Sequence, residues 1–220
     1  MTSAPSDPGR SEDAADASRA PGASGRAPRV LVTGFEPFGE HKTNASWEAV
    51  RTLRDQRPPG FELTVALLPV VYDAVSEGLP QLLTAVRPDL TVLCGVSGKA
   101  TKLRLEAAGT NAIGTSPDNL GRRPMGSTGR LDGPTERRTE LPLEAMIRAA
   151  SGVGDGAVRS DDAGDYLCNF AYYRALEWLD HQGEPARAVF LHVPVLGRVW
   201  TPPVLAEGIE RIVRAALQEI

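Results

Sequence analysis

The sequence predicts an α/β protein with a single three-layer α/β/α sandwich around a mostly parallel, twisted central sheet. Segments typical of strands alternate with segments typical of helices along most of the chain, and several strand segments are continuously apolar. Strands that are buried on both faces give unbroken apolar runs, and alternation of strands with helices is the pattern of crossover connections in a parallel sheet.

The first half of the body alternates strands with helices. Residues 29–33 (RVLVT) form a short apolar run, which predicts a buried strand. Asn44 or Ser46 is suited to cap the helix that follows, because short polar side chains satisfy free N–H groups there. We expect a strand at 61–71, a helix at 72–86 despite Pro80, and a strand at 89–94.

The second half continues the pattern after a long interruption. Residues 101–113 alternate loosely between apolar and charged side chains, which indicates a strand. Residues 114–138 are rich in Gly, Pro, Asn, Asp and Arg and are predicted to form a long loop. The remaining elements expected are a helix at 143–150, a short strand within 151–164, a helix at 166–181, a strand at 186–193 and a helix at 202–220.

The amino-terminal segment differs in composition from the body. Residues 1–28 contain no Phe, Trp, Tyr, Leu, Ile or Val, and 19 of the 28 are Ala, Ser, Pro or Gly. Such a segment buries too little apolar surface to offset its ordering entropy, so we expect a disordered tail followed by one domain at 29–220. It also lacks the apolar core of a secretory signal. With only two cysteines in the chain, a cytoplasmic location is expected.

Composition and charge exclude several classes of partner. The chain has 220 residues and a formal net charge of -4, which provides no general basic field for nucleic acid or anionic lipid. No apolar run approaches the roughly 20 residues of a membrane span. The three histidines, at 41, 181 and 192, show no metal-binding spacing. We therefore expect no nucleic-acid partner, no membrane association, no metal and no cofactor.

One possible phosphate-binding motif fails on inspection. Gly98-Lys99 in GVSGKAT is similar to the end of a P-loop, but the full pattern needs Gly at position 93 and Ser or Thr at position 100. Those positions hold Leu93 and Ala100, and the segment that follows is predicted to be a strand instead of a helix.

Three residues could form a nucleophilic hydrolase site. His192 ends an apolar strand, where open α/β sheets place their ligands. Cys168 lies near the start of a helix, whose free N–H groups and dipole favour a thiolate; Asp165 is the expected N-cap. Glu106 lies on an otherwise apolar strand. A cysteine, a histidine that accepts its proton and a carboxylate that orients the histidine make a catalytic set.

Packing roles remain open for each of these residues. A lone helical cysteine is usually a small core residue, and Cys94, in the middle of an apolar strand, is expected to be one. A histidine at a strand end is often a hydrogen-bonded structural residue, and a single glutamate on a strand usually faces solvent. Chemistry alone therefore leaves the hydrolase reading and the structural reading both possible.

Several segments resemble the pyroglutamyl peptidase type I (pyrrolidone-carboxylate peptidase) family. They cover nearly all of 29–220 in the family's order. The similar segments are VLVTGFEPFG at 30–39, LPVVY at 68–72, LRLEAAGTNAI at 103–113, SPDNLG at 116–121, DYLCNFAYY at 165–173 and VFLHVP at 189–194.

The resemblance implies a metal-free cysteine peptidase on an α/β/α sandwich that removes N-terminal pyroglutamate (5-oxoproline) from short peptides. Carried over by position, Cys168 is the nucleophile, His192 the base and Glu106 the orienting acid. Phe35 and Phe38 would line the pocket for the lactam ring. Asn44 stands at the Asn of the family's Asn-Pro-Ser, and it is expected to bind substrate together with the two phenylalanines. Family members often self-associate, so a homo-oligomer is possible.

The chain departs from the family pattern around this set. Ala107 replaces the Arg that usually follows the Glu, Lys99 stands where Arg is usual, and Val96 stands where many members have Gln. These changes affect the expected substrate preference and rate more than the reaction class. Two alternatives stay open: a related cysteine amidohydrolase for another cyclic or N-acyl amide, and a catalytically silent homologue that acts as a binding scaffold.

Overall fold

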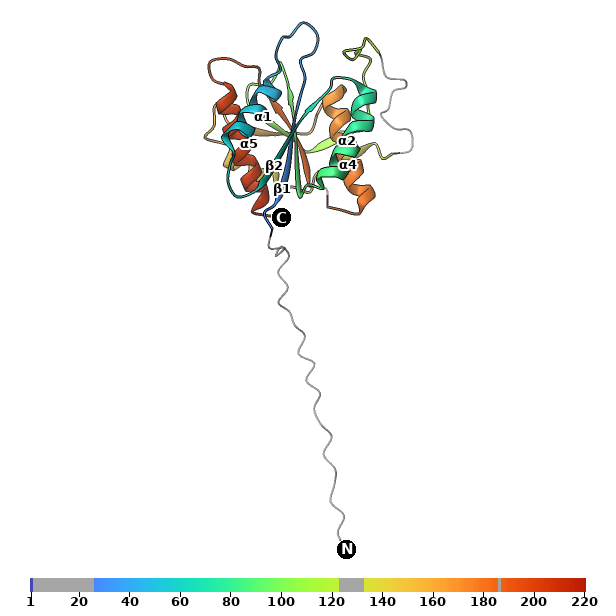
Figure 1. The fold of residues 1–220 in the computed structure, drawn as a ribbon, viewed down its shortest axis with the longest axis vertical. Coiled ribbons are helices and arrows are strands. Elements are labelled where there is room, and N and C mark those ends of the chain that lie inside the picture. Colours follow the sequence, from blue (N-terminus) through green and yellow to red (C-terminus); the bar gives the residue numbers. More distant parts are fainter. Residues whose placement is uncertain (2–25, 123–132, 186) are drawn as a thin grey trace.

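A six-stranded sheet with helices on both faces forms the body of the protein (Figure 1). The computed structural model describes residues 1, 26–122, 133–185 and 187–220. The elements in chain order are β1 (Arg29–Phe35), α1 (Ala45–Gln56), β2 (Glu62–Leu68), α2 (Tyr72–Val86), β3 (Leu90–Val96), β4 (Leu103–Glu106), β5 (Ala108–Thr110), β6 (Glu136–Arg138), α3 (Leu143–Ala149), β7 (Ala157–Ser160), α4 (Leu167–Gln182), β8 (Ala188–Val193) and α5 (Pro202–Leu217).

The sheet is mostly parallel, as predicted. Its strand order is β2-β1-β3-β8-β4-β7, and β2, β1, β3 and β8 run parallel to one another. β4 runs antiparallel to β8, and β7 is parallel to β4. Because β4 runs antiparallel to β8, the register between these two strands determines which of their side chains lie next to each other.

Two apolar cores lie on the two faces of the sheet. One core joins the sheet to α1, α3 and α5, and the other joins it to α2 and α4. Figure 1 shows α1 and α5 on one side of the edge-on sheet and α2 and α4 on the other. Successive residues of a strand point to opposite faces, so Leu191 and Val193 enter the first core and Phe190 enters the second. The predicted α/β/α sandwich is confirmed.

The helix at α2 tolerates its internal proline because a neighbouring helix replaces the lost hydrogen bond. Pro80 has no N–H to donate to the carbonyl of Ser76, four residues earlier. The guanidinium of Arg174, on α4, donates to that carbonyl at 3.3 Å. The two helices pack side by side, and the predicted bounds of this helix are confirmed.

The single strand predicted at 101–113 is wrong, because the chain changes partners in the middle of it. β4 belongs to the main sheet, whereas β5 pairs with β6 in a separate two-stranded sheet. The change occurs at Ala107, whose N–H donates to Ser160 on the β7 side and whose carbonyl accepts from Thr139 on the β6 side. β6 lies within the segment predicted to be a loop, 114–138, of which 123–132 is outside the described residues.

The body begins a few residues before the predicted boundary. Both terminal nitrogens of Arg26 lie 2.8 Å from the carboxylate of Asp89, and the Pro28 carbonyl accepts from the N–H of Glu62 at 2.8 Å. Residues 26–28 are therefore bound to the sheet, and most of the predicted tail, 2–25, is outside the described residues. In the described part of the chain, no helix combines the length and the apolar character of a membrane span.

Candidate active site

A buried carboxylate–imidazole pair lies at the centre of the sheet. Nδ1 of His192 is 2.8 Å from Oε1 of Glu106, and the two residues are 7% and 0% exposed. With Glu106 ionised, Nδ1 carries the proton and Nε2 is left to exchange protons with another group. Glu106 is thus not the solvent-facing residue that a single glutamate on a strand usually is.

The register of β4 against β8 creates this pair. Glu106 is directly opposite Phe190, and Arg104 is directly opposite His192. These four side chains share one face of the sheet, because alternate residues of a strand point the same way. Glu106 reaches the ring of His192 along the diagonal, a separation that a long side chain can span.

The thiol of Cys168 lies over the neighbouring strand on the same face. A Cβ placed on Gly95 would be 2.7 Å from Sγ of Cys168 and 2.7 Å from Cζ of Phe190. Gly95 pairs with His192 across β3 and β8, so its missing side chain and the imidazole point the same way. Glycine at position 95 therefore leaves the space that the thiol occupies beside His192.

The electrostatic surroundings of the thiol favour its neutral form. Burial raises the pKa of Cys168 to about 12, the negative charge of Glu106 acts in the same direction, and the backbone N–H of Cys168 itself lowers it. A thiolate at this position therefore needs a cation beside it, and His192 can become that cation by taking the thiol proton. The thiol of Cys94, in contrast, is fully buried in the core, and burial alone raises its pKa.

The acidic residue expected to cap α4 does not do so. The prediction that Asp165 is the N-cap is wrong, because the cap is Tyr166, without a side-chain cap bond, and Cys168 is the second helical residue. Asp161 instead pairs with Arg138 and Arg159. The carboxylate that acts on the thiol is Glu106, on a different element.

Two side chains of α4 fix that helix against the strands of the site. The hydroxyl of Tyr172, one turn after Cys168, donates to the backbone carbonyl of Glu106 at 2.9 Å. The buried amide of Asn169 accepts from the N–H of Thr110 at 2.8 Å and donates to the carbonyls of Thr110 and Ala112. Both contacts hold the cysteine-bearing helix at a set distance from the glutamate-bearing strand.

A small, mainly apolar cavity opens beside the thiol. Its volume is about 50 Å³, and its lining residues come from the loop after β1, the ends of β2 and β3, and the start of α4. They are Phe35, Phe38, Asn44, Val70, Val96, Tyr166, Leu167 and Cys168. The three residues predicted to bind substrate therefore lie together beside Cys168.

The three predicted pocket residues differ in their surroundings. Phe35 is 3% exposed, and besides lining this cavity it packs in the α2/α4 core. Phe38 is half-buried and contacts the ring of His41. Asn44 caps α1 by accepting from Ser46, and its amide nitrogen donates to the carbonyl of Glu36. Both ends of its amide are thus engaged within the protein.

A second loop holds the wall of this cavity in place. The amide of Asn119, from the SPDNLG segment, donates to the carboxylate of Glu36 at 3.0 Å and to the carbonyl of Pro37 at 2.9 Å. Glu36 also accepts from the N–H of Val70 at 2.9 Å. The hydroxyl of Tyr166 donates to the carbonyl of Pro117. Contacts from this loop therefore brace both sides of the cavity.

The departures from the family pattern lie in three different environments. Val96 lines the cavity itself and gives it an apolar wall. Lys99 is exposed in the loop after β3. Ala107 is buried in the α1/α3/α5 core, on the face of the sheet opposite His192. Of the three, Val96 alone is placed to contact a ligand bound beside Cys168.

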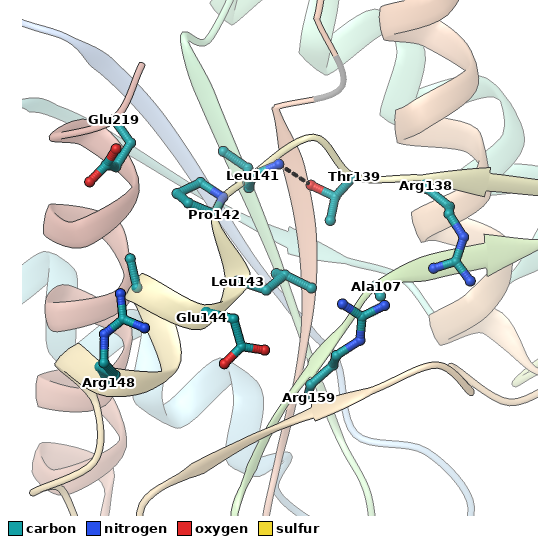
Figure 2. Close-up of a pocket in the computed structure, with 11 residues that line it drawn as sticks. Ala107, Arg138, Thr139, Leu141, Pro142, Leu143, Glu144, Arg148, Arg159 and Glu219 are labelled. Carbon is teal, nitrogen blue, oxygen red and sulfur yellow. Dashed lines mark hydrogen bonds between the residues drawn. The ribbon is translucent and has the colours of Figure 1, made fainter.

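A larger cavity, of about 450 Å³, lies on the opposite face behind Glu106. Its wall includes Ala107, Leu141 and Leu143, with charged side chains of both signs around its edge (Figure 2). Arg138 and Arg159 are both engaged with Asp161. This cavity contains no member of the cysteine–histidine–glutamate set.

Sequence reasoning missed two groups near the site. Tyr166 and Leu167 line the cavity because α4 begins there, and the family-like DYLCNF segment could have drawn attention to them. Arg104 lies beside the buried carboxylate, with Nε 3.5 Å from Oε1 of Glu106. Its position two residues before Glu106 on an alternating strand was the available signal. Among the described residues, no group of three or more His, Cys, Asp or Glu side chains is arranged to hold a metal ion.

A buried carboxylate–imidazole pair and a thiol on the same face of an α/β/α sandwich are the components of a cysteine hydrolase. Comparison with known proteins identifies which kind. The family model for pyroglutamyl peptidase matches residues 28–211. The chain belongs to the pyroglutamyl peptidase family, a family of cysteine peptidases.

Curated relatives agree with this assignment over most of their length. The chain is 36% identical over 189 residues to the pyrrolidone-carboxylate peptidase of Thermococcus onnurineus, covering 85% of this chain and 94% of that protein. It is 38% identical over 194 residues to the mouse pyroglutamyl-peptidase 1, covering 87% and 88%.

A solved structure agrees as well. A mutant pyrrolidone carboxyl peptidase from Pyrococcus furiosus superposes with a TM-score of 0.80 and 28% identity, covering 87% of this chain and 99% of that one. The pyrrolidone carboxyl peptidase of Thermococcus litoralis gives a TM-score of 0.79 and 26% identity over 87% and 94%.

Proposed function

We propose that this protein is a cysteine peptidase that removes N-terminal pyroglutamate from short peptides, with Cys168, His192 and Glu106 as its catalytic residues. The observation that carries the proposal is the 2.8 Å contact between Glu106 and His192, on the face where the thiol of Cys168 lies over Gly95. Membership of the pyroglutamyl peptidase family supports the substrate class.

In the first half of the reaction, the pyroglutamyl group of the peptide acylates the enzyme. Nε2 of His192 takes the proton of Cys168, and Sγ attacks the carbonyl carbon between pyroglutamate and the next residue. The tetrahedral intermediate then collapses: the C–N bond breaks, the imidazolium protonates the leaving amine, and a thioester remains. Glu106 stabilises the imidazolium through Nδ1 while both charges exist.

In the second half, water releases the product. His192 takes a proton from a water molecule, and the resulting hydroxide attacks the thioester carbonyl. The C–S bond breaks, the proton returns to Sγ, and free pyroglutamate leaves. Both tetrahedral intermediates carry an oxyanion. The first N–H groups of α4 have no acceptor within the helix and are suited to stabilise that charge.

The cavity beside Cys168 supports recognition of a flat, neutral ring. Its wall offers aromatic and aliphatic surface from Phe35, Phe38 and Val96. Apolar contact of this kind orients a small ligand that carries no charge, and aromatic side chains provide it at low entropic cost. We expect Phe35 and Phe38 to contact the ring and Asn44 to hold the loop that presents them.

The proposal also covers the extent of the catalytic domain and the location of the protein. Residues 26–220 are the catalytic domain, because residues 26–28 are bound to the sheet, and the segment before Arg26 is a dispensable tail, on its composition. A cytoplasmic location is supported by the two cysteines, both of which are free thiols.

The test compares hydrolysis of pyroglutamyl-β-naphthylamide with hydrolysis of the prolyl compound, which has the ring but lacks its carbonyl. The wild-type protein should hydrolyse the pyroglutamyl compound with a strong preference over the prolyl one. Cys168→Ser should lose this activity while keeping the melting temperature, and His192→Ala should lose it as well. No activity on the pyroglutamyl compound, with activity on another N-acyl amide, would instead support the related amidohydrolase, for which apolar Val96 is the structural argument.

A further inference from the structure

The carboxylate of Glu106 lies in surroundings that need an explanation. The side chain is 0% exposed, Oε1 faces Nδ1 of His192, and Oε2 has no hydrogen-bond partner within the described residues. A buried carboxylate with one neutral partner is costly in its charged form and tends to take up a proton. A protonated Glu106 would no longer stabilise an imidazolium at His192.

Arg104 is the cation on the same strand and the same face. Its Nε lies 3.5 Å from Oε1 of Glu106, and β4 places it directly opposite His192. Its guanidinium is fixed from the neighbouring strand, because NH2 donates to Oγ of Ser160 at 2.6 Å and to the carbonyl of Asp162 at 3.0 Å. Arg104 therefore cannot swing freely away from the carboxylate.

The other charged or titratable groups around Glu106 have different partners. On α4, Cys168 carries a thiol, and Tyr172 donates to the backbone carbonyl of Glu106 instead of its carboxylate. On β6, Arg138 pairs with Glu136 and Asp161. On β7, Arg159 pairs with Asp161 as well. Among the described residues, the partners of the Glu106 carboxylate are the guanidinium of Arg104, which supplies a permanent positive charge, and the imidazole of His192.

We propose that Arg104 is a positioning residue for the hydrolysis: its guanidinium compensates the buried negative charge of Glu106 and holds the carboxylate in place, and Glu106 in turn holds His192 in the tautomer and orientation that catalysis needs. The inference rests on the proposed function, since hydrolysis is its readout.

The test is the pH dependence of kcat/KM for Arg104→Met, Arg104→Lys and the control Arg159→Met. An opposite charge within about 4–6 Å typically shifts an ionisation by one to three pH units. In Arg104→Met the pH below which kcat/KM declines should rise by about one unit. At lower pH, kcat/KM should be roughly tenfold below the wild-type value. The loss should fall on kcat more than on KM, because the ring cavity is unchanged. Arg104→Lys should recover most of the lost kcat/KM, and the pH profile of Arg159→Met should match that of the wild type.

Two results would overturn the inference. One is a profile of Arg104→Met that superimposes on the wild-type profile. The other is a loss that is equal at every pH and accompanies a lower melting temperature, as expected of a purely structural residue. If Arg104→Met does not fold, Ser160→Ala removes one anchor of the guanidinium and keeps its charge. It should shift the acid limb in the same direction by a smaller amount, and no shift would count against the proposal. An inactive wild type would instead reject the proposed function.

Discussion

The thiol of Cys168 fills the space that a side chain at position 95 would need, and Gly95 leaves that space free. A Cβ there would lie 2.7 Å from Sγ, too close for two such atoms. Because Gly95 pairs with His192 in the sheet, this fit sets the thiol beside the imidazole. The relationship predicts a sharp effect of a very small substitution.

Gly95→Ala should inactivate the enzyme by displacing the thiol. Neither Sγ nor the ring of Phe190 can move away without disturbing the site, so we expect at least about a hundredfold loss of kcat/KM. Gly98→Ala is the matched control, since a Cβ on Gly98 meets no atom within 4 Å. Equal activity of the two variants would mean that the position of the thiol is not set by Gly95.

Glu106→Gln should reduce activity and leave the fold intact. The amide has the size of the carboxylate but no charge to stabilise the imidazolium of His192, so kcat should fall on the order of 10²–10⁴-fold. Steady-state kinetics together with circular dichroism checks this. Activity within about twofold of wild type would remove Glu106 from the mechanism.

Phe35 and Phe38 should respond differently to truncation. Phe35 is 3% exposed and packs in the α2/α4 core, so Phe35→Ala should destabilise the protein by about 3–5 kcal/mol as well as weaken substrate binding. Phe38 is half-buried, so Phe38→Ala should raise KM with little change in melting temperature. Chemical denaturation and KM measured on both variants test this pair. An unchanged KM in Phe38→Ala would show that the ring binds elsewhere.

Stability should decline in mildly alkaline solution because of Cys94. Burial raises the pKa of this thiol above its ordinary value of 9.0, so the unfolded chain loses the proton first as the pH rises. The native state then binds more protons than the unfolded state, and the free energy of unfolding falls with pH. The full stability is present below about pH 9, and above it Cys94 contributes a loss that approaches roughly 1.4 kcal/mol per pH unit, beside a loss of the same sign from Cys168.

Urea denaturation between about pH 8 and pH 10 measures this slope, and comparison with Cys94→Ala removes the contribution of the tyrosines, which begin to ionise in the same range. Cys94→Ala should be less stable at every pH but should show a shallower decline. Parallel curves for the variant and the wild type would contradict the assignment.

The parts of the fold that local pattern determines were predictable from the sequence. The buried strands and amphipathic helices follow from periodicity, and α2 survives Pro80 because Arg174 supplies the missing donor to Ser76. The split at Ala107 was not predictable, because it depends on partners from β6 and β7 that lie far away in the sequence. The N-cap at Tyr166 was missed because this residue makes no side-chain capping bond that a sequence pattern could reveal.

The site shows the same division. Motifs brought Cys168, His192 and Glu106 to attention, but their meeting depends on β4 running antiparallel to β8, which no local pattern encodes. Arg104 was visible only as a charged residue on an alternating strand. Its contact with Glu106 becomes evident once the register is known.

The central claim is that Cys168 forms a thioester with the pyroglutamyl group. Rapid acid quenching of the wild-type enzyme during turnover of a pyroglutamyl substrate, followed by peptide mass spectrometry, tests it most directly. We predict that the peptide containing Cys168 gains the mass of one pyroglutamyl group, that the peptide containing Cys94 does not, and that the adduct is absent in Cys168→Ala. Steady hydrolysis of the same substrate by Cys168→Ala, or an adduct on Cys94 alone, would contradict the account.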